Sequence, residues 1–502
     1  MQCHNRLMTE QRKPEPESSL AGLEARFRRD LGLLTPPPTK DWLEPRVHPQ
    51  YGPVLDVAII GAGMAGLSAA FALKCQALRS LRVFDRAPEG LEGPWATTAR
   101  METLRSPPEL SGPSFQLASL TFRAWFEAQF GAREWGKLHR IPRLQWMDYL
   151  RWYRRMIDVP VENGTELIDI DGDEDLVLLT LRSREGARKV AARRVVLANG
   201  RDGLGGPYMP EIFRELDPRF VMHSLGEIDF SKLRGKTVGI IGAGSTACDC
   251  SAEALEHGAA RAAMLVRRAD VPRINKNMGI GSTGFWQGFY SLTDAQKWEI
   301  VNYVDDQGVP APRNSMLRCS RHKNFSIIAR CAVRAAAVRD SQVMLDTTRG
   351  SLAFDRVILA TGLTVDWNQR PEFAALKPHV QLWRDHFVPA AGADYPQAEH
   401  PYLGAHFEFR PRKSAPIWVN RIHCFNYAAT MSHGPISGDI PAISLGAERT
   451  ARGVVNGLFA EDYQRTWQRL AGWSNPELRG DEYVLDEDVS KFLADEPADA
   501  KT

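Results

Sequence analysis

The sequence predicts an α/β fold in which one strand–helix–strand unit occurs twice. The string Ile-Ile-Gly-Ala-Gly occurs at residues 59–63 and again at residues 240–244. Each copy follows a largely apolar, β-branched run and precedes a helical run, an order typical of parallel sheets buried on both faces. A chain of 502 residues, 43% of them hydrophobic and 25% charged, is long and apolar enough for two such domains.

The first copy has every component of a dinucleotide-binding unit. A strand is expected at residues 54–60, a helix at 67–73, and a second strand at 81–84 that ends at Asp85. Between the first strand and the helix stand three glycines at motif spacing: Gly61, Gly63 and Gly66. They make the tight turn, let the backbone approach a pyrophosphate, and let the helix pack on the strand. The acidic residue is then placed to accept a hydrogen bond from a ribose hydroxyl.

The second copy ends differently. Its strand at residues 237–241 leads into four residues that can meet phosphate oxygens: Gly242, Gly244, Ser245 and Thr246. The following strand, at residues 262–266, ends in Arg267 and Arg268, where the first copy has an acid. Guanidinium groups bind a 2′-phosphate bidentately, so this copy predicts a phosphorylated dinucleotide.

Two further apolar strands end in a small residue, a polar residue and glycine. One runs from residue 195 to Asn199 and Gly200, and the other from residue 357 to Thr361 and Gly362. Each lies downstream of one glycine turn, so we expect each strand to return to the sheet beside that turn. The fold class is therefore two Rossmann-like domains, with the first split in sequence and the second inserted into it.

Composition excludes several other functions. The chain has 63 Lys plus Arg and 61 Asp plus Glu, a near balance that argues against a nucleic-acid partner. Seven cysteines include Cys248 and Cys250 but no CxxC, so we expect free buried thiols and neither a disulfide framework nor a metal site. The uncharged stretch 57–73 is too short and glycine-rich to span a membrane. The polar residues 1–18 lack the apolar core of a secretory signal, so a cytoplasmic location is expected.

Several segments resemble the single-component flavin monooxygenases that use FAD and NADPH. Residues 93–95 (Gly-Pro-Trp) are similar to the Gly-Gly-x-Trp stretch of these enzymes. Residues 142–152 and 433–440 resemble two segments of the N-hydroxylating branch, the ornithine and lysine hydroxylases. The resemblance covers roughly residues 50–460. Together with the motifs it implies that FAD and NADPH are bound by the following residues: Gly61, Ala62, Gly63, Ala65, Gly66, Asp85, Arg86, Pro94, Trp95, Asn199, Gly200, Gly242, Gly244, Ser245, Thr246, Arg267, Arg268, Thr361, Gly362 and Asp439.

The resemblance also implies a reaction. NADPH reduces FAD, the reduced flavin captures O2 as a C4a-hydroperoxide, and a small nucleophilic substrate accepts one oxygen atom. N-hydroxylation of an amine or S-oxidation is the favoured outcome. The cofactor performs the chemistry, so no single catalytic side chain is required. Asn314 and His433 are the only candidates for such a role. The expected partners are a small-molecule substrate and O2, with no nucleic acid and no membrane, and a homo-oligomer is left open.

Other functions remain open at this stage. The branch's substrate-contacting lysine is expected shortly after Met101, where the only nearby cation is Arg105. A Baeyer–Villiger oxygenase would need the histidine of its signature, for which His223 is a candidate, although Asp217 and Arg219 stand where the Phe and Gly of that signature belong. A disulfide reductase is disfavoured by the missing CxxC. A non-catalytic flavoprotein that serves as a binding module is the remaining alternative.

The sequence is expected to divide into an arm at 1–50, the first segment of an FAD-binding domain at 51–205, an NADPH-binding domain at 206–355 with an insertion at 272–328, the second segment of the FAD-binding domain with the substrate pocket at 356–460, and a tail at 461–502. Leucine and phenylalanine at helical spacing predict a short helix in the arm, before the proline run 36–38. In the insertion, Thr293 and Gln296 predict a capping box. The glycine-rich loop 279–286 is expected to be either a surface loop or a wall of the substrate pocket. Asn324 and Asn426 are further candidates for substrate or nicotinamide contact, and the acidic tail is expected to be solvated.

Overall fold

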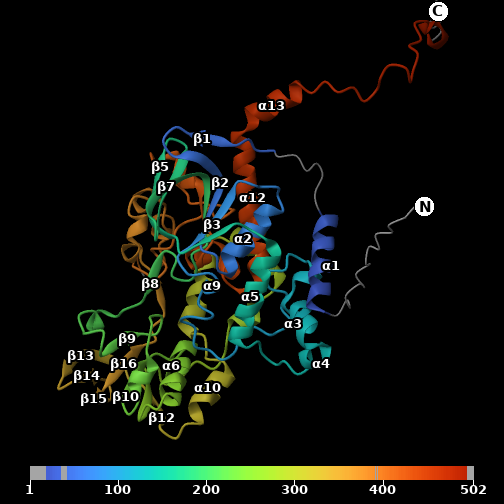
Figure 1. Ribbon diagram of the computed structural model, residues 1–502. Helices are drawn as coiled ribbons and strands as arrows, with labels where there is room; N and C mark the ends of the chain where they lie inside the picture. Colours follow the sequence, from blue (N-terminus) through green and yellow to red (C-terminus); the bar gives the residue numbers. More distant parts are fainter. Residues whose placement is uncertain (1–18, 35–41, 391, 393, 494–502) are drawn as a thin grey trace, which may run out of the picture. The chain divides into compact units, whose positions relative to one another are not determined.

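The computed structural model describes residues 19–34, 42–390, 392 and 394–493 (Figure 1). The polar N-terminal segment, the proline run 36–38 and the acidic residues from 495 onward lie outside these ranges. Residues up to Leu458 belong to one compact unit, and residues from Phe459 onward belong to a second unit.

The first sheet has eight strands and is parallel at its centre. Strands β4, β3, β2, β7 and β18 run parallel, whereas β1, β6 and β5 are antiparallel to their neighbours. Their bounds are β1 Arg46–His48, β2 Gly52–Ile60, β3 Leu81–Asp85, β4 Val161–Asn163, β5 Glu166–Asp173, β6 Leu176–Ser183, β7 Gly186–Leu197 and β18 Ile422–Cys424. The β2 residues 57–59 are fully buried, as an apolar run with helices on both faces requires. Helix α2 (Met64–Lys74) follows β2, and β7 returns beside β2, so both expectations for this unit are confirmed.

The second sheet has five parallel strands in the order β12-β11-β10-β16-β9. Their bounds are β9 Val221–His223, β10 Thr237–Ile241, β11 Arg261–Val266, β12 Phe325–Ala329 and β16 Arg356–Leu359. Helix α6 (Ser245–Glu256) follows the second glycine turn, and β16 pairs with β10, which confirms the second unit.

The boundary expected at residue 355 needs one correction. Strand β16 lies after it but pairs with β10 and β9, so this strand belongs to the second sheet. The chain passes back toward the first sheet at β17 (Leu363–Val365), which pairs antiparallel with β8 (Gly205–Pro207). The two segments by which the chain passes between the sheets are therefore hydrogen-bonded to each other through β8 and β17.

Helices with buried aromatic side chains pack beside the first sheet. Helix α1 (Leu20–Leu33), expected in the arm, buries Leu23 and Phe27, and the Phe27 ring lies 6.4 Å from that of Phe71 in α2. The chain also forms the helices α3 Phe122–Phe130, α4 Ala132–Trp135, α5 Arg143–Ile157, α11 Thr430–His433 and α12 Ile443–Glu461. In α5, Tyr149 is fully buried and donates its hydroxyl hydrogen to the Leu120 carbonyl at 2.7 Å.

The expected insertion is mostly helical. It contains α7 Asn277–Ile280, α8 Thr283–Gly288, α9 Asp294–Gln307 and α10 Arg313–Ser320. The capping box of Thr293 and Gln296 at the start of α9 is confirmed. The last stretch of the expected insertion is β12, a strand of the second sheet, so the helical insertion ends before Phe325. A three-stranded antiparallel sheet follows, formed by β13 Val333–Arg339, β14 Gln342–Thr347 and β15 Gly350–Phe354.

The second unit contains helix α13 (Tyr463–Ala471). Trp467 and Leu470 of this helix are exposed. Among the helices in the described residues of the chain, none combines the length and the apolar character needed to cross a bilayer.

Candidate nucleotide and substrate site

The first glycine turn accepts only glycine at two of its three positions. Gly61 has φ of +102°, and a Cβ there would lie 2.5 Å from the Ala198 carbonyl oxygen. A Cβ on Gly66 would lie 1.7 Å from the Gly61 oxygen. Beside Gly63 the nearest atom to such a Cβ is 3.8 Å away, in Gly93, so the backbone is open to a ligand here. No side chain caps the N-terminus of α2, which leaves its first N–H groups free to meet an anion.

Asp85 is held rigidly at the end of β3. Its Oδ2 accepts a hydrogen bond from the Ala62 backbone N–H at 2.6 Å, and its Oδ1 accepts one from the Ala87 N–H at 2.7 Å. The carboxylate is buried, yet each oxygen retains a lone pair for a ribose hydroxyl. The neighbouring Arg86 is exposed and lies 4.0 Å from the carboxylate of Asp202.

A cavity beside this turn adds residues that the sequence motifs did not single out. It is lined by Ala62, Gly63, Met64, Leu67, Glu89, Gly90, Glu92, Met147, Leu150, Arg151 and Arg154. Glu92 is buried, pairs with Arg154, and accepts a hydrogen bond from Asn163 at 2.7 Å. The only signal for Arg154 was its position just after the segment 142–152 on the same helix. Nearby, the Trp95 ring meets Trp146 edge to face at 6.4 Å.

The second glycine turn repeats the geometry of the first. A Cβ on Gly242, at φ +143°, would lie 2.5 Å from the Ala360 oxygen, whereas a Cβ on Gly244 would meet no atom within 4 Å. Ala247, fully buried, occupies the third glycine position. No side chain caps α6, so this turn also fits a diphosphate. Ser245 Oγ accepts a hydrogen bond from Arg105 Nη2 at 2.5 Å.

Three arginines gather at the carboxyl edge of the second sheet. Arg267 is exposed, and Arg268 donates to the Gln307 carbonyl at 2.9 Å. Arg330 follows β12, the parallel neighbour of β11, and donates its backbone N–H to the Arg268 carbonyl at 2.8 Å. The sequence motif did not include Arg330, although its position directly after an apolar strand was the available signal.

The polar residues at the ends of the two returning strands are hydrogen-bonded within the protein. Asn426 Nδ2 donates to Asn199 Oδ1 at 2.9 Å and to the Leu197 carbonyl at 3.3 Å. Thr361 Oγ1 donates to the Tyr208 carbonyl at 2.5 Å. Gly200 and Gly362 are exposed, with φ of +87° and +89°, which favours glycine at both positions. Asn324 lies elsewhere and donates to two carbonyl groups before β11.

His223 and Thr361 also lie together. His223 Nδ1 accepts from the Leu225 N–H at 3.2 Å, so its Nε2 is the protonated nitrogen, 3.2 Å from Thr361 Oγ1. Burial lowers the pKa of His223 to about 4. The ring is therefore neutral at pH 7 and both of its nitrogens have partners.

The two catalytic candidates occupy different environments. His433 is fully buried between the rings of Phe407 and Tyr290, with centroids at 3.8 and 4.9 Å. Its Nε2 lies 2.9 Å from the Gly404 carbonyl and its Nδ1 lies 3.2 Å from Arg449 Nη1, so both ring nitrogens have protein partners. Burial and the nearby Arg449 charge hold its pKa well below the usual value.

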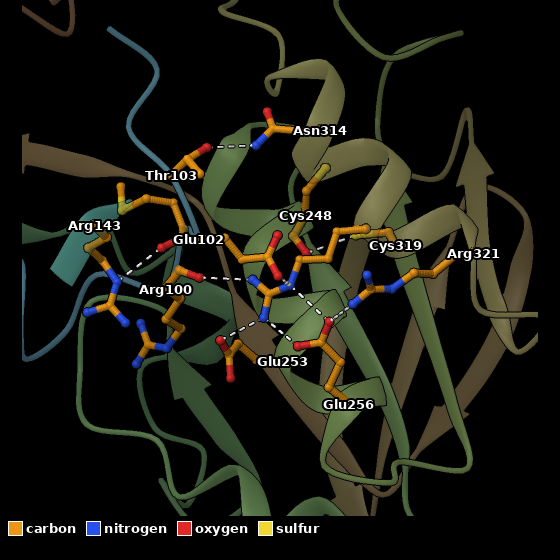
Figure 2. Close-up of polar contacts among 12 residues, drawn as sticks. Arg100, Glu102, Thr103, Arg143, Cys248, Glu253, Glu256, Asn314, Cys319 and Arg321 are labelled. Carbon is orange, nitrogen blue, oxygen red and sulfur yellow. Dashed lines mark hydrogen bonds and ion pairs between the residues drawn. The ribbon is translucent and has the colours of Figure 1, made fainter. Parts of the chain in front are cut away.

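Asn314 is exposed at the start of α10 and donates to Thr103 Oγ1 at 2.9 Å (Figure 2). This contact joins the insertion to the segment that follows the Gly-Pro-Trp stretch. Farther along α10, Arg318 donates to the Arg100 carbonyl at 3.0 Å and to Glu253 of α6 at 2.8 Å (Figure 2). The segment around residues 100–105 is thus held by the second domain.

The insertion also contacts the stretch of chain that returns to the first sheet. Trp286 packs against the first hydrophobic core. From α9, Asp294 accepts a hydrogen bond from the Tyr402 hydroxyl at 3.0 Å, and Asp305 accepts one from Gln397 Nε2 at 2.8 Å. The insertion is therefore not simply a surface loop of the second domain, and its role as a pocket wall stays a prediction.

Charged groups meet where the two domains face each other. Asp439 is accessible to solvent, but burial by the surrounding protein raises the pKa of its carboxyl, against the charges of Arg201 and Arg105. Burial lowers the pKa of Arg105, and Asp249 opposes that change. Two guanidinium groups and one carboxylate are therefore close enough to affect one another.

Comparisons with known proteins agree with this geometry. A family model described as FAD-NAD(P)-binding matches residues 58–202, and a model for L-lysine 6-monooxygenase/L-ornithine 5-monooxygenase matches residues 134–365. The FAD-dependent urate hydroxylase of Xanthomonas campestris pv. campestris is 38% identical over 465 residues, which is 92% of this chain and 98% of that protein.

Solved structures share the fold at low identity. The ornithine hydroxylase of Pseudomonas aeruginosa has a TM-score of 0.63 at 17% identity, over 81% of this chain and 100% of that one. The L-lysine 6-monooxygenase of Pseudomonas syringae has a TM-score of 0.62 at 18% identity, over 80% of this chain and 99% of that one. The ornithine N-hydroxylase of Kutzneria sp. 744, solved with reduced FAD, NADP+ and L-ornithine, has a TM-score of 0.61 at 17% identity. The match covers 80% of this chain and 99% of that one.

Proposed function

The chain belongs to the flavin-dependent monooxygenase family that includes the FAD-dependent urate hydroxylase, and on this premise we propose that its substrate is urate or a closely related oxidised purine. FAD and NADPH are its cofactors, and it is an oxidoreductase. The observation that supports this substrate is the extent of the match. The urate hydroxylase aligns with 92% of this chain, whereas the lysine and ornithine model stops at residue 365, before Tyr427 and Asp439.

The residues present fit both cofactors, and we propose the predicted cofactor residues as their ligands. The open backbone at Gly63 and Gly244 leaves room for two diphosphates at uncapped helix N-termini. Asp85 is placed to bind a ribose, and Arg267 and Arg268 to bind a 2′-phosphate. Bound FAD, reduced by NADPH, supplies the activation of O2.

The positive charges of Arg105 and Arg201 support a substrate that carries an anionic group. Arg105 stands where the lysine of the N-hydroxylating branch is expected. Arg201 lies close enough for its positive charge to lower the pKa of Arg105. A guanidinium attracts the planar anionic edge of a deprotonated purine and can bind it through two parallel hydrogen bonds. The NADPH requirement and the free cysteines of the described chain support a cytoplasmic location as an element of this proposal.

The test is substrate-dependent turnover by the FAD-loaded protein. We expect urate to stimulate NADPH oxidation and O2 consumption together. The product detected should be one oxygen atom heavier than urate, or should be the compound that forms when this oxygenated product is hydrolysed. Ornithine, lysine, sulfides and ketones serve as the comparison panel. NADPH oxidation that urate does not stimulate, or that yields only hydrogen peroxide with urate, would contradict the proposal.

N-hydroxylation of an amine, or S-oxidation, is the second candidate function. The match of residues 134–365 to the lysine and ornithine monooxygenase model favours it. The same panel decides between the two candidates. An oxygenated product from ornithine, lysine or a sulfide, with none from urate, assigns the second function.

A further inference from the structure

Arg201 lies beside the predicted flavin site for a topological reason. Strands β7 and β18 are both parallel to β2, so their carboxyl ends meet the edge of the sheet that carries Gly61. Arg201 lies in the loop after β7, and Tyr427 lies shortly after β18. The two loops are joined by a hydrogen bond from the Tyr427 N–H to the Gly200 carbonyl at 3.3 Å.

The guanidinium of Arg201 is available to a ligand. It is exposed and lies over the Tyr427 ring, 5.9 Å from its centre. Within the described chain no hydrogen bond or ion pair engages it, in contrast to Arg105, which donates to Ser245 Oγ and to the Pro310 carbonyl. A guanidinium that lies over an aromatic ring keeps its in-plane N–H groups free for a bidentate contact.

The surroundings of Arg201 can recognise a flat molecule with several polar edges. Its positive charge lowers the pKa of both Asp439 and Tyr427, so both groups lie within electrostatic reach of it. Asp305, which also acts on Tyr427, holds the amide nitrogen of Gln397 at 2.8 Å. The carbonyl oxygen of Gln397 is buried and has no partner in the described chain. The free guanidinium of Arg201 matches the anionic acceptor atoms of an oxidised purine.

We propose that Arg201 is a specificity-determining residue that binds the anionic edge of a planar heterocyclic substrate, while Tyr427 holds the guanidinium in position. This assignment rests on the proposed function, because it takes a deprotonated purine as the ligand. Arg201 stands in the segment Asn-Gly-Arg-Asp-Gly-Leu-Gly-Gly-Pro at residues 199–207, outside the dinucleotide motifs themselves. Its guanidinium selects the charge of the substrate, and a cationic amine is disfavoured at the same position.

The test compares FAD-loaded wild-type protein with Arg201→Gln, Arg201→Lys and a control variant, Arg339→Gln. Arg339 is exposed at the end of β13, in the three-stranded sheet, so its loss leaves the surroundings of Arg201 intact. Binding of urate is measured from the change in flavin absorbance of the oxidised protein, without turnover. A neutral N-methylated urate is the matched ligand. KM for urate and for NADPH, kcat and FAD content are measured on the same preparations.

Loss of a charge-assisted contact should weaken urate binding by about 10- to 100-fold in Arg201→Gln. Arg201→Lys should restore some of the loss, since the charge remains but the bidentate geometry is gone. We expect the neutral ligand to bind weakly and equally to all four proteins, and KM for NADPH to stay constant.

Three results would overturn the assignment. If wild-type protein binds urate and Arg201→Gln binds it equally well, Arg201 has no such role while the proposed function stands. If KM for NADPH or the FAD content changes and urate affinity does not, Arg201 is a nucleotide contact. If wild-type protein neither binds nor oxidises urate, the proposed function fails and the assignment of Arg201 fails with it.

Discussion

At the scale of single residues, we propose that three arginines decide which nicotinamide nucleotide the second site prefers. Arg267 and Arg268 follow β11, and Arg330 follows the neighbouring parallel strand β12, so all three lie at one edge of the sheet. The first site has Asp85 at the equivalent strand end. A carboxylate there disfavours a 2′-phosphate through charge repulsion, and arginines favour it.

The variant with Arg267→Ala and Arg268→Ala should therefore lose selectivity for NADPH. We expect KM for NADPH to rise about 10- to 100-fold, because contacts to a charged group are lost, while KM for NADH changes little. Arg330→Ala alone should give a smaller rise in the same direction. Steady-state KM values for both nucleotides check this, with Arg339→Gln as the control. An equal rise for NADPH and NADH would show that these arginines do not read the 2′-phosphate.

At the scale of elements, one buried arginine, Arg318, joins α10, α6 and the segment around residue 100. The side chain of Arg318 is 5% exposed and donates to Glu253 at 2.8 Å, to Glu256 and to the Arg100 carbonyl at 3.0 Å. Arg321 also pairs with Glu256, but its side chain is 56% exposed. Figure 2 shows Arg321 reaching Glu256, which also accepts a hydrogen bond from Arg318.

Arg318→Ala should destabilise the protein far more than Arg321→Ala. Removing Arg318 leaves the Arg100 carbonyl without its donor, takes the arginine partner from the partly buried Glu253, and leaves Glu256 with Arg321 as its remaining arginine partner. This should lower the free energy of unfolding by about 2–4 kcal/mol. Removing the exposed Arg321 should cost about 1 kcal/mol or less. Urea unfolding of the FAD-saturated proteins measures both values. Similar losses in the two variants would mean that the contacts of Arg318 add little to stability.

The same elements show which features the sequence could predict. The strand–turn–helix units at β2 and β10 were predicted correctly, because apolar runs that end in spaced glycines are local signals. The return of β16 beside β10 was also expected, but the domain boundary at residue 355 was placed before this strand, because such a boundary depends on pairing with residues far away in the sequence. The Arg318 cluster was also missed. In the sequence, charged residues such as Glu253, Glu256 and Arg318 are typical of solvent-exposed helix faces. Their contacts arise only from the tertiary packing of α6 against α10.

At the scale of the whole molecule, buried histidines link folding to pH. His400 is 6% exposed and its Nδ1 lies 3.0 Å from the Ala428 carbonyl, so Nδ1 is the protonated nitrogen. His423 is 3% exposed, and its Nδ1 lies 2.8 Å from the His406 carbonyl. Burial lowers the pKa of His400 and of His423 to about 4. Together with His223, they keep neutral rings in the first sheet, in the second sheet and in the segment between them.

The protein should therefore lose stability as the pH falls from about 6.5 to 4, before most carboxylates are protonated. In this window the unfolded chain binds protons at these histidines and the folded chain does not, so each lower pH favours unfolding. For a group shifted from 6.5 to about 4, the loss is at most about 3 kcal/mol. His400→Gln should flatten the dependence of unfolding free energy on pH relative to wild type. The exposed His139→Gln should leave it unchanged. Urea unfolding at pH 7, 6, 5 and 4 measures the three curves. A His400→Gln curve parallel to that of wild type would show that protonation of this buried ring does not contribute to acid unfolding.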